Sequence, residues 1–346
     1  MIFSPLSLLQ VDGRRLSIEQ QGDQLNIDLE GRFVGSLVVA TGGQRARLML
    51  RPCEVEQVKD LTLAALHAAF LVHPVRELAL SVTGQAQVSL LLREGLAVHA
   101  PDSEVLICPQ HLFRQHPQPW LAYPPSSQYP LQYRLSNGKR HPQRAPRQPG
   151  TVYRRYVAEI AETISLRTLD PQQDLEVFSR WQNDPRVAAF WEMTGSQQAH
   201  REYLDALLAD PKVHPLIACF NDEPFAYFEA YWAREDRIAP YYDVQDYDRG
   251  VHMLVGEQRY RGAHRVSAWL SSLAHFLFLD DARTQRVVAE PRADNAKMIN
   301  YLQRAGFYRE KEFDFPHKRA AMMILPREVF FADAPNHGEQ ALVACS

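Results

Sequence analysis

Two residues in the second half of the sequence, His252 and Glu290, are of the types that transfer protons in enzymes. His252 lies inside Gly250–Gly256, a stretch predicted to form a strand, and Glu290 ends another predicted strand immediately before Pro291. An imidazole titrates near neutral pH, so it can accept a proton or orient a nucleophile, and a carboxylate can orient the histidine or accept a proton itself. The alternatives are a structural histidine and a strand-end acid that is satisfied by local backbone.

A basic segment with a glycine, Arg259-Tyr-Arg-Gly-Ala-His264, lies between a predicted strand and a long predicted helix. Gly262 lets the backbone come close to a ligand, and the amide groups at the start of the following helix favour anionic oxygens. Arg259, Arg261 and Arg265 add charges that phosphate groups could use. The alternative is a plain helix entry with arginines on the surface.

A third group combines aromatic rings with carboxylates. If the strands bring these residues together, they form an aromatic-walled slot that suits an amine on a short methylene chain. The alternative is a mixed core with a charged rim. Lys318 could meet a substrate carboxylate if the substrate is an amino acid. The members of the group are Trp191, Glu192, Glu229, Tyr231, Trp232, Glu235 and Asp236.

The elements that must position these residues follow from the spacing of apolar residues after Ile164. The expected order is strand, helix, helix, three strands, helix, strand, helix and two strands. A strand, a long helix and a further strand in succession favour one parallel pair in an otherwise antiparallel sheet. The expected helices are 174–181, 198–208, 263–279 and 295–305, and the expected strands are 164–167, 216–220, 225–232, 250–256, 285–290, 308–313 and 320–325.

The first part of the chain predicts a separate, small α+β domain over residues 1–116. Strands are expected at 25–29, 35–39, 47–50 and 88–92, and a helix at 62–70. Eight of the 23 prolines fall within 117–149, together with a cluster of basic residues, so we expect a linker over 117–150. The basic run could touch a phosphate or be solvated. A second domain over 151–332 and a tail over 333–346 complete the expected organisation.

Composition narrows the class of protein. A hydrophobic fraction of 46% in 346 residues is enough for packed cores, and a net charge of -3 argues against a protein dominated by nucleic-acid binding. The four cysteines form no C-x-x-C pair, so we expect free thiols in a reducing compartment. The N-terminus does not resemble a secretory signal, and no apolar run is long enough to span a bilayer. The expectation is a cytoplasmic protein without a metal site.

The order of elements resembles the GNAT acyltransferase fold, an α+β fold with a mixed, mostly antiparallel sheet flanked by helices. Over roughly residues 164–330 the sequence is similar to the siderophore branch of that family, which includes aerobactin-type N-hydroxylysine acetyltransferases and alcaligin-type and mycobactin-type acyltransferases. The runs that carry the resemblance are Trp181-Gln-Asn-Asp-Pro185, Phe190-Trp-Glu192, Tyr231-Trp-Ala-Arg-Glu-Asp236, Asp248-Arg-Gly-Val-His252, Glu290-Pro-Arg-Ala-Asp-Asn295 and Phe313-Asp-Phe-Pro-His-Lys318.

The resemblance implies roles for these residues. His252 would be catalytic, and Glu290 occupies the position of an aspartate in the mycobactin-type relative. The loop would bind the pyrophosphate of coenzyme A, although His264 stands where the family prefers a small residue. Asn295 would either cap its helix or reach the coenzyme A arm. The residues expected to bind the coenzyme are Val255, Arg259, Arg261, Gly262, Ala263, His264, Arg265 and Asn295.

The implied reaction transfers an acetyl group from acetyl-CoA to an N-hydroxylated amine, such as N-hydroxylysine or N-hydroxyornithine, and forms a hydroxamate for a siderophore. Transfer of a succinyl or other acyl group to an N-hydroxylated diamine, or a module that binds coenzyme A without turnover, are the alternatives. An amine hydroxylase and a siderophore synthetase are the implied partners. Residues 1–116 could be a decayed GNAT-like half or a dimerisation unit.

Overall fold

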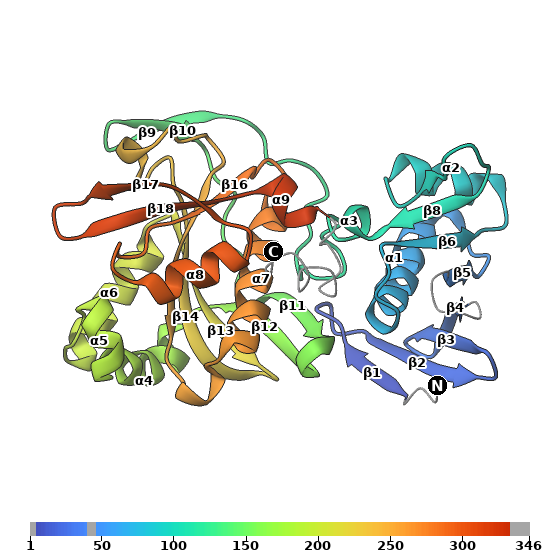
Figure 1. The fold of residues 1–346 in the computed structure, drawn as a ribbon, viewed down its shortest axis with the longest axis horizontal. Coiled ribbons are helices and arrows are strands. Elements are labelled where there is room, and N and C mark those ends of the chain that lie inside the picture. Colours follow the sequence, from blue (N-terminus) through green and yellow to red (C-terminus); the bar gives the residue numbers. More distant parts are fainter. Residues whose placement is uncertain (1–4, 40–45, 333–346) are drawn as a thin grey trace, which may run out of the picture. The chain divides into compact units, whose positions relative to one another are not determined.

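The structure is a computed structural model that describes residues 5–39 and 46–332 (Figure 1). Contacts divide the chain into two compact units. The N-terminal unit holds the described residues up to Pro119 together with Phe331 and Ala332, and the C-terminal unit holds Trp120–Phe330. The predicted tail, 333–346, and Cys345 lie outside the described residues. None of the helices in the described ranges has the length and apolar character needed to cross a membrane.

The C-terminal unit is built on an eight-stranded sheet with the order β11-β12-β13-β14-β15-β16-β18-β17. Every neighbouring pair is antiparallel except β15 and β16, which are parallel, as the sequence predicts. The strands are β11 (Thr151–Val157), β12 (Glu162–Thr168), β13 (Val213–Phe220), β14 (Glu223–Trp232), β15 (Arg249–Val255), β16 (Arg286–Ala289), β17 (Tyr308–Asp314) and β18 (Arg319–Pro326).

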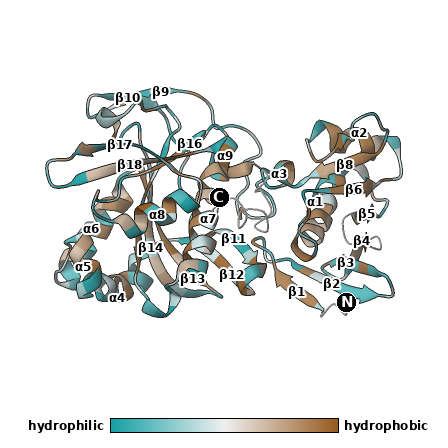
Figure 2. Ribbon diagram, in the orientation of Figure 1, coloured by the Kyte–Doolittle hydropathy of each residue, from teal (hydrophilic) through white to brown (hydrophobic). Residues whose placement is uncertain are grey.

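Helices cover both faces of this sheet. The long helix α7 (Ala263–Asp280) packs against β11, β12 and β16, and α8 (Ala296–Arg304) packs beside it against β17 and β18. A second group, α4 (Pro171–Gln182), α5 (Pro185–Trp191) and α6 (Gln197–Ala209), joins the sheet through β13. Val187 is the buried residue of α5, and the long helix α7 is largely hydrophobic in Figure 2. The short helix α9 (Arg327–Phe331) ends the described chain.

Capping residues explain where several of these helices begin. Asp170, Asp184 and Ser196 each accept a hydrogen bond from a backbone amide in the first turn of α4, α5 and α6. Prolines at the first helical position of α4 and α5 add to the signal. Part of the run Trp181-Gln-Asn-Asp-Pro185 is therefore a helix-capping sequence.

The N-terminal unit repeats the same topology. Its sheet has the order β1-β2-β3-β4-β5-β6-β8-β7, and β5 and β6 are its parallel pair. The helix between β5 and β6, α1 (Val55–Val72), has 18 residues, as α7 does, and much of it is hydrophobic in Figure 2. The strands are β1 (Leu6–Leu9), β2 (Arg15–Gln21), β3 (Gln24–Leu29), β4 (Arg32–Val39), β5 (Ala46–Leu50), β6 (Glu77–Ser81), β7 (Val98–His99) and β8 (Leu106–Pro109).

This topology favours the interpretation of the first part of the chain as a GNAT-like half. One prediction there was wrong, because residues 88–92 belong to helix α2 (Gln85–Arg93) and not to a strand. Gln87 and Leu91 are the buried residues of this helix. They are four residues apart, which puts them on one helical face. A short helix, α3 (Gln110–Phe113), completes this unit.

The proline-rich segment differs from the open linker that its composition predicts. It contains a hairpin of β9 (Tyr133–Ser136) and β10 (Lys139–Pro142), and its second half is held on the C-terminal unit. Arg144 forms a buried bidentate ion pair with Glu235, and Arg147 donates to the backbone carbonyls of residues at the end of α6. Two of the basic residues expected to be solvated are thus used in packing.

Candidate active site

A buried cluster of three ionisable residues lies where β14, β15 and β16 meet. His252 of β15 stands between two carboxylates, with Nδ1 2.7 Å from Oε2 of Glu229 and Nε2 2.7 Å from Oε1 of Glu290. Glu229 is the direct neighbour of His252 on β14, and Glu290 follows the last residue of β16. We call these three residues the acid–histidine cluster.

Tyrosine hydroxyls satisfy the remaining carboxylate oxygens of the cluster. Tyr203 and Tyr227 both donate to Oε1 of Glu229, the latter at 2.9 Å, and Tyr231 donates to Oε2 of Glu290 at 2.8 Å. Glu229 and Glu290 are buried, whereas the side chain of His252 is 23% exposed. The carboxylates are therefore fixed in position, and the histidine is the member that faces the open side.

The charges of the cluster hold it in one protonation state near neutral pH. Burial by itself would lower the pKa of His252, but the charges and hydrogen bonds of Glu290 and Glu229 outweigh it and raise the pKa to about 10. Burial likewise opposes ionisation of Glu290, but the His252 imidazolium lowers the pKa of that carboxyl to about 2. The cluster then contains one imidazolium and two carboxylates, so neither ring nitrogen is free to accept a proton.

Backbone geometry explains why these side chains can meet. Along β14 the side chains alternate, so Tyr227, Glu229 and Tyr231 share one face of the sheet. A Cβ at Gly250, opposite Tyr231 on β15, would lie 2.0 Å from the tyrosine ring. Only a glycine at that position lets the Tyr231 ring lie flat over the strand and reach Glu290.

The strands separate directly beside the cluster. Pairing between β15 and β16 is confined to Arg249 with Val287 and Gly250 with Val288, so the strands part before His252. On the far side of β15, Arg186 donates to the carbonyls of Val255 and Gly256 at 3.0 and 2.9 Å. The end of β15 is thereby anchored to α5 while its other edge stays open toward β16.

The predicted phosphate-binding loop follows β15 and leads into α7. Gly262 caps α7 with φ of 126°, a conformation that favours glycine, and no side chain caps the helix. Ala263 and His264 are exposed in the first turn. Arg259 pairs with Glu223 and Arg265 with Glu162, whereas Arg261 is exposed with no ion pair recorded among the described residues. Two of the three arginines thus have protein partners, and Arg261 remains available.

Asn295 has a structural role in the described chain. Its side-chain oxygen accepts a hydrogen bond from the amide of Met298 at 3.1 Å and caps α8. The capping alternative for this residue is therefore observed, and a contact with coenzyme A remains a prediction.

The residues predicted to bind substrate divide into two groups. Trp191 lies beside the cluster, with its ring centroid 6.4 Å from that of His252, and Lys318 donates to the backbone carbonyl of Glu290 at 2.8 Å. Asp236 is buried near them: burial raises its pKa, and the charge of His252 opposes that rise. Glu192, at the C-cap of α5, is exposed on the same side, and the structure records no ion pair for it within the described ranges.

Trp232 and Glu235 point away from the cluster. Trp232 follows Tyr231 on β14, so its side chain lies on the opposite face, between the guanidinium groups of Arg144 and Arg249, each 4.1 Å from the ring centroid. Glu235 binds Arg144 and His141. The prediction that all seven aromatic and acidic residues share one slot is therefore wrong for these two.

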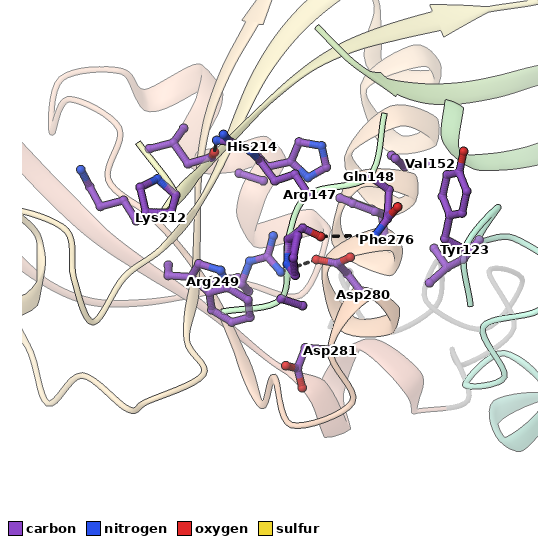
Figure 3. Close-up of a pocket in the computed structure, with 17 residues that line it drawn as sticks. Tyr123, Arg147, Gln148, Val152, Lys212, His214, Arg249, Phe276, Asp280 and Asp281 are labelled. Carbon is purple, nitrogen blue, oxygen red and sulfur yellow. Dashed lines mark hydrogen bonds and ion pairs between the residues drawn. The ribbon is translucent and has the colours of Figure 1, made fainter. Parts of the chain in front are cut away.

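A separate pocket lies on that opposite face (Figure 3). Its lining includes Trp232, His214 and Arg249, which pairs with Asp280 at 2.7 Å. It contains no member of the acid–histidine cluster. We therefore place the candidate active site at the cluster and not in this pocket.

Three residues that help to build the site were missed by sequence reasoning. Tyr203 and Tyr227 hold Glu229, and Arg186 fixes the end of β15. The alternation along β14 places Tyr227 on the face of Glu229, so that contact could have been anticipated. Tyr203 lies on α6, and nothing in its local sequence indicates which strand the helix covers.

Comparisons with known proteins identify the domain that contains this site. Residues 170–315 match the model of the acetyltransferase (GNAT) domain. The chain is 50% identical over 221 residues to a putative lysine N-acyltransferase of Schizosaccharomyces pombe, covering 64% of this chain and 66% of that protein. It is also 50% identical over 192 residues to the N(6)-hydroxylysine O-acetyltransferase of Escherichia coli, covering 56% of this chain and 61% of that protein.

A fungal relative and a solved structure extend the comparison. The chain is 49% identical over 198 residues to an N(5)-hydroxyornithine:cis-anhydromevalonyl coenzyme A-N(5)-transacylase of Beauveria bassiana, covering 56% of this chain and 44% of that protein. An uncharacterized protein of Bacillus halodurans is similar in structure, with a TM-score of 0.51 and 27% identity over 53% of this chain and 94% of that one. The chain thus spans between 44% and 66% of the length of these curated relatives. Over residues 170–315 the chain thus matches the acetyltransferase (GNAT) domain and has its fold.

Proposed function

We propose that the protein is an acyl-CoA-dependent acyltransferase that converts an N-hydroxylated amino acid into a hydroxamate for siderophore biosynthesis. The observation that carries the proposal is the acid–histidine cluster, placed where β15 and β16 separate and on the strand that leads into the glycine loop at the start of α7. The names of the relatives, which include hydroxylysine and hydroxyornithine acyltransferases, support the class of acceptor.

The co-substrate is acetyl-CoA or another acyl-CoA. The start of α7 offers backbone amides, the conformation of Gly262 and the unpaired charge of Arg261, which together suit a pyrophosphate. β15 is not paired with β16 beyond Gly250, and the loop follows this unpaired end of β15. One relative uses an anhydromevalonyl donor by name, so the acyl group differs within the family, and we propose acetyl for this chain.

We propose that the acid–histidine cluster accepts and then returns the single proton that the reaction transfers. The nitrogen of the hydroxylated amine attacks the thioester carbonyl, the carbon–sulfur bond breaks, and the N–H proton must end on the departing sulfur. An imidazolium between two carboxylates carries one net negative charge. Because the pKa of Glu290 is about 2, its carboxylate holds this proton only transiently and passes it on to the thiolate, which is the far stronger base. In the proposed mechanism His252 orients the reacting groups by donating hydrogen bonds, and Glu290 accepts the proton.

Trp191, Glu192, Asp236 and Lys318 surround the open side of the cluster and are proposed to contact the acceptor. We propose an amine hydroxylase as the enzyme that supplies this acceptor and a siderophore synthetase as the enzyme that consumes the hydroxamate. Both follow from the chemistry of substrate and product.

The test is release of free thiol from acetyl-CoA by the purified chain. N6-hydroxylysine, N5-hydroxyornithine, N-hydroxyputrescine and lysine are offered in parallel, and the acylated product is identified by mass spectrometry. We expect turnover with a hydroxylated acceptor and little with lysine, whose amine is protonated near neutral pH. Equal turnover with lysine would contradict the hydroxamate proposal. An absence of thiol release with all four acceptors would contradict acetyl transfer.

A further inference from the structure

Three side chains that can carry positive charge gather around one aromatic ring beside the acid–histidine cluster. The Arg237 guanidinium carbon lies 5.3 Å from the centroid of Phe315, and Nζ of Lys318 lies 5.6 Å from the same centroid. The His317 ring stacks on Phe315 at 5.4 Å. Phe315 is itself buried, so it fixes the place where these groups meet.

These three groups are not held in direct ion pairs. No ion pair from Arg237, His317 or Lys318 to a carboxylate is recorded within the described residues. Burial lowers the pKa of Lys318, the carboxylate of Glu290 opposes this, and the positive charges of Arg237 and Arg292 lower the pKa further. The pKa of His317 is lowered by burial and then by Arg237 and Lys318, although Glu192 and Glu290 oppose this. Like charges are thus held close together at a cost that a bound anion would relieve.

The position of this group ties it to the reaction. Lys318 donates to the backbone carbonyl of Glu290, and so it lies against the residue proposed to accept the proton. Arg237 follows Asp236 in the chain and is exposed, which leaves its guanidinium open to a ligand. Its charge also acts on Tyr203, which holds Glu229. An anion at Arg237 and Lys318 would therefore sit beside the acid–histidine cluster and outside it.

We infer that Arg237 and Lys318 bind the α-carboxylate of the acceptor, so that the enzyme acts on a hydroxylated amino acid and discriminates against the corresponding diamine. An amino acid presents both groups at the ends of a short methylene chain, with the hydroxylated nitrogen at the cluster and the carboxylate at the cations. A planar guanidinium and an ammonium together match the two oxygens of a carboxylate. The inference rests on the proposed function and adds to it the feature of the acceptor that is selected.

The first arm of the test compares two acceptors on the unaltered protein. N6-hydroxylysine and N-hydroxycadaverine differ only in the carboxylate, and both are assayed by thiol release from acetyl-CoA. We expect kcat/KM to favour the amino acid by about tenfold or more, because a charge-assisted contact is lost with the diamine. Equal use of the two acceptors would overturn the inference and leave the proposed function standing.

The second arm uses Arg237→Gln, with Arg201→Gln as the matched control. Arg201 is an arginine on α6 whose partner is Asp205 and which contacts none of the three cations. Arg237→Gln should raise KM for N6-hydroxylysine about tenfold while KM for acetyl-CoA and KM for N-hydroxycadaverine stay within about twofold. The control should match the unaltered protein for every substrate.

The outcomes separate the two claims. A rise in KM of the same size for both acceptors in Arg237→Gln would show that the residue acts on something other than the carboxylate, and would overturn the inference. No turnover with any hydroxylated acceptor in the unaltered protein would overturn the proposed function and the inference with it.

Discussion

The two units of this chain share a topology and differ in chemistry. Each has eight strands in the same order, with one parallel pair at the fifth and sixth positions and an 18-residue helix between the members of that pair. In the C-terminal unit the strands present Glu229, His252 and Glu290 to one another. In the N-terminal unit, β5 reads Ala-Arg-Leu-Met-Leu and contains neither a histidine nor a carboxylate.

The start of the helix that follows the fifth strand also differs between the two units. In the C-terminal unit α7 begins at Gly262, after a loop with three arginines in and beside it. In the N-terminal unit α1 begins after Pro52-Cys53-Glu54, with Glu56 in its first turn and no glycine. Acidic residues at a helix start repel a phosphate that the basic loop would attract. The fold therefore supplies a scaffold, and the substitutions at two places in it decide where a site can exist.

The largest expected effect comes from removing the proton acceptor. Glu290→Gln should lower kcat by about 100- to 10,000-fold, since general acid–base groups contribute that much, and should leave the Kd for acetyl-CoA within about threefold. The matched variant in the other unit is Glu77→Gln, on β6, which is the strand that corresponds to β16. Steady-state kinetics should find the Glu77 variant unaltered, and a Glu290 variant with near-normal kcat would remove this residue from the mechanism.

The next effect concerns the start of α7. Gly262→Val places a β-branched residue at φ of 126°, so the loop must change shape and binding of acetyl-CoA should weaken by about 10- to 100-fold. Gly84→Val is the control, because Gly84 has φ of 101° at the start of α2 in the N-terminal unit. Fluorescence titration with acetyl-CoA should separate the two variants. Similar losses in both would indicate general misfolding in place of a local loop effect.

Two strand glycines give a smaller and more structural test. A Cβ at Gly250 would meet the Tyr231 ring at 2.0 Å, and a Cβ at Gly35 on β4 would meet the carbonyl oxygen of Met49 at 2.6 Å. Each change to alanine should lower the free energy of unfolding by about 1–3 kcal/mol. Only Gly250→Ala should also reduce kcat, because Tyr231 holds Glu290. Denaturant unfolding and thiol release on both variants check this, and a loss of kcat in Gly35→Ala would contradict the separation of the units.

The smallest effect is a pH dependence that distinguishes two histidines. The pKa of His252 is raised to about 10 from 6.5, so its contribution to stability is complete below about pH 6.5 and is lost as the pH rises toward 10. The pKa of Glu290 is lowered to about 2 from 4.5, so its contribution is present above about pH 4.5 and is lost as the pH falls toward 2. The cluster therefore stabilises the unit most between these two ranges.

The measurement compares His252→Asn with His73→Asn. Burial lowers the pKa of His73 in the N-terminal unit, so protonation of His73 opposes folding and its effect is confined to acid pH. The midpoint of denaturant unfolding is measured at about pH 6 and at about pH 9. The two midpoints should be similar in His252→Asn, and they should differ in His73→Asn and in the unaltered chain. A His252 variant that keeps the full difference between the two pH values would contradict the raised pKa.

Much of the C-terminal unit could be predicted from the sequence. Apolar spacing predicts α7 and the strands around it, and β15 lies within one residue of its predicted bounds, 250–256. The carboxylate at Glu290 was also expected near the histidine. That both nitrogens of His252 would be occupied could not be predicted, since Glu229 reaches it through the pairing of β14 with β15.

The predictions for Trp232, Glu235 and the proline-rich segment were wrong for physical reasons. Trp232 and Glu235 were grouped with Tyr231 by proximity in the chain, but strand alternation and the ion pair with Arg144 turn them to the other face. The composition of the segment around Arg144 predicts a solvated linker, because prolines and arginines are common in linkers. The buried partner of Arg144 is Glu235, which lies 91 residues away in the sequence. Local sequence does not encode such distant pairs.

The most direct test of the comparison is the number of acetyl-CoA molecules that bind to one chain. Two units of the same topology are present, and we propose that only the glycine loop of the C-terminal unit binds the coenzyme. Isothermal titration calorimetry on the purified protein should therefore give a stoichiometry of about one acetyl-CoA per chain. A stoichiometry of two would show that the N-terminal unit also binds the coenzyme, and an absence of binding would contradict the assignment of the loop.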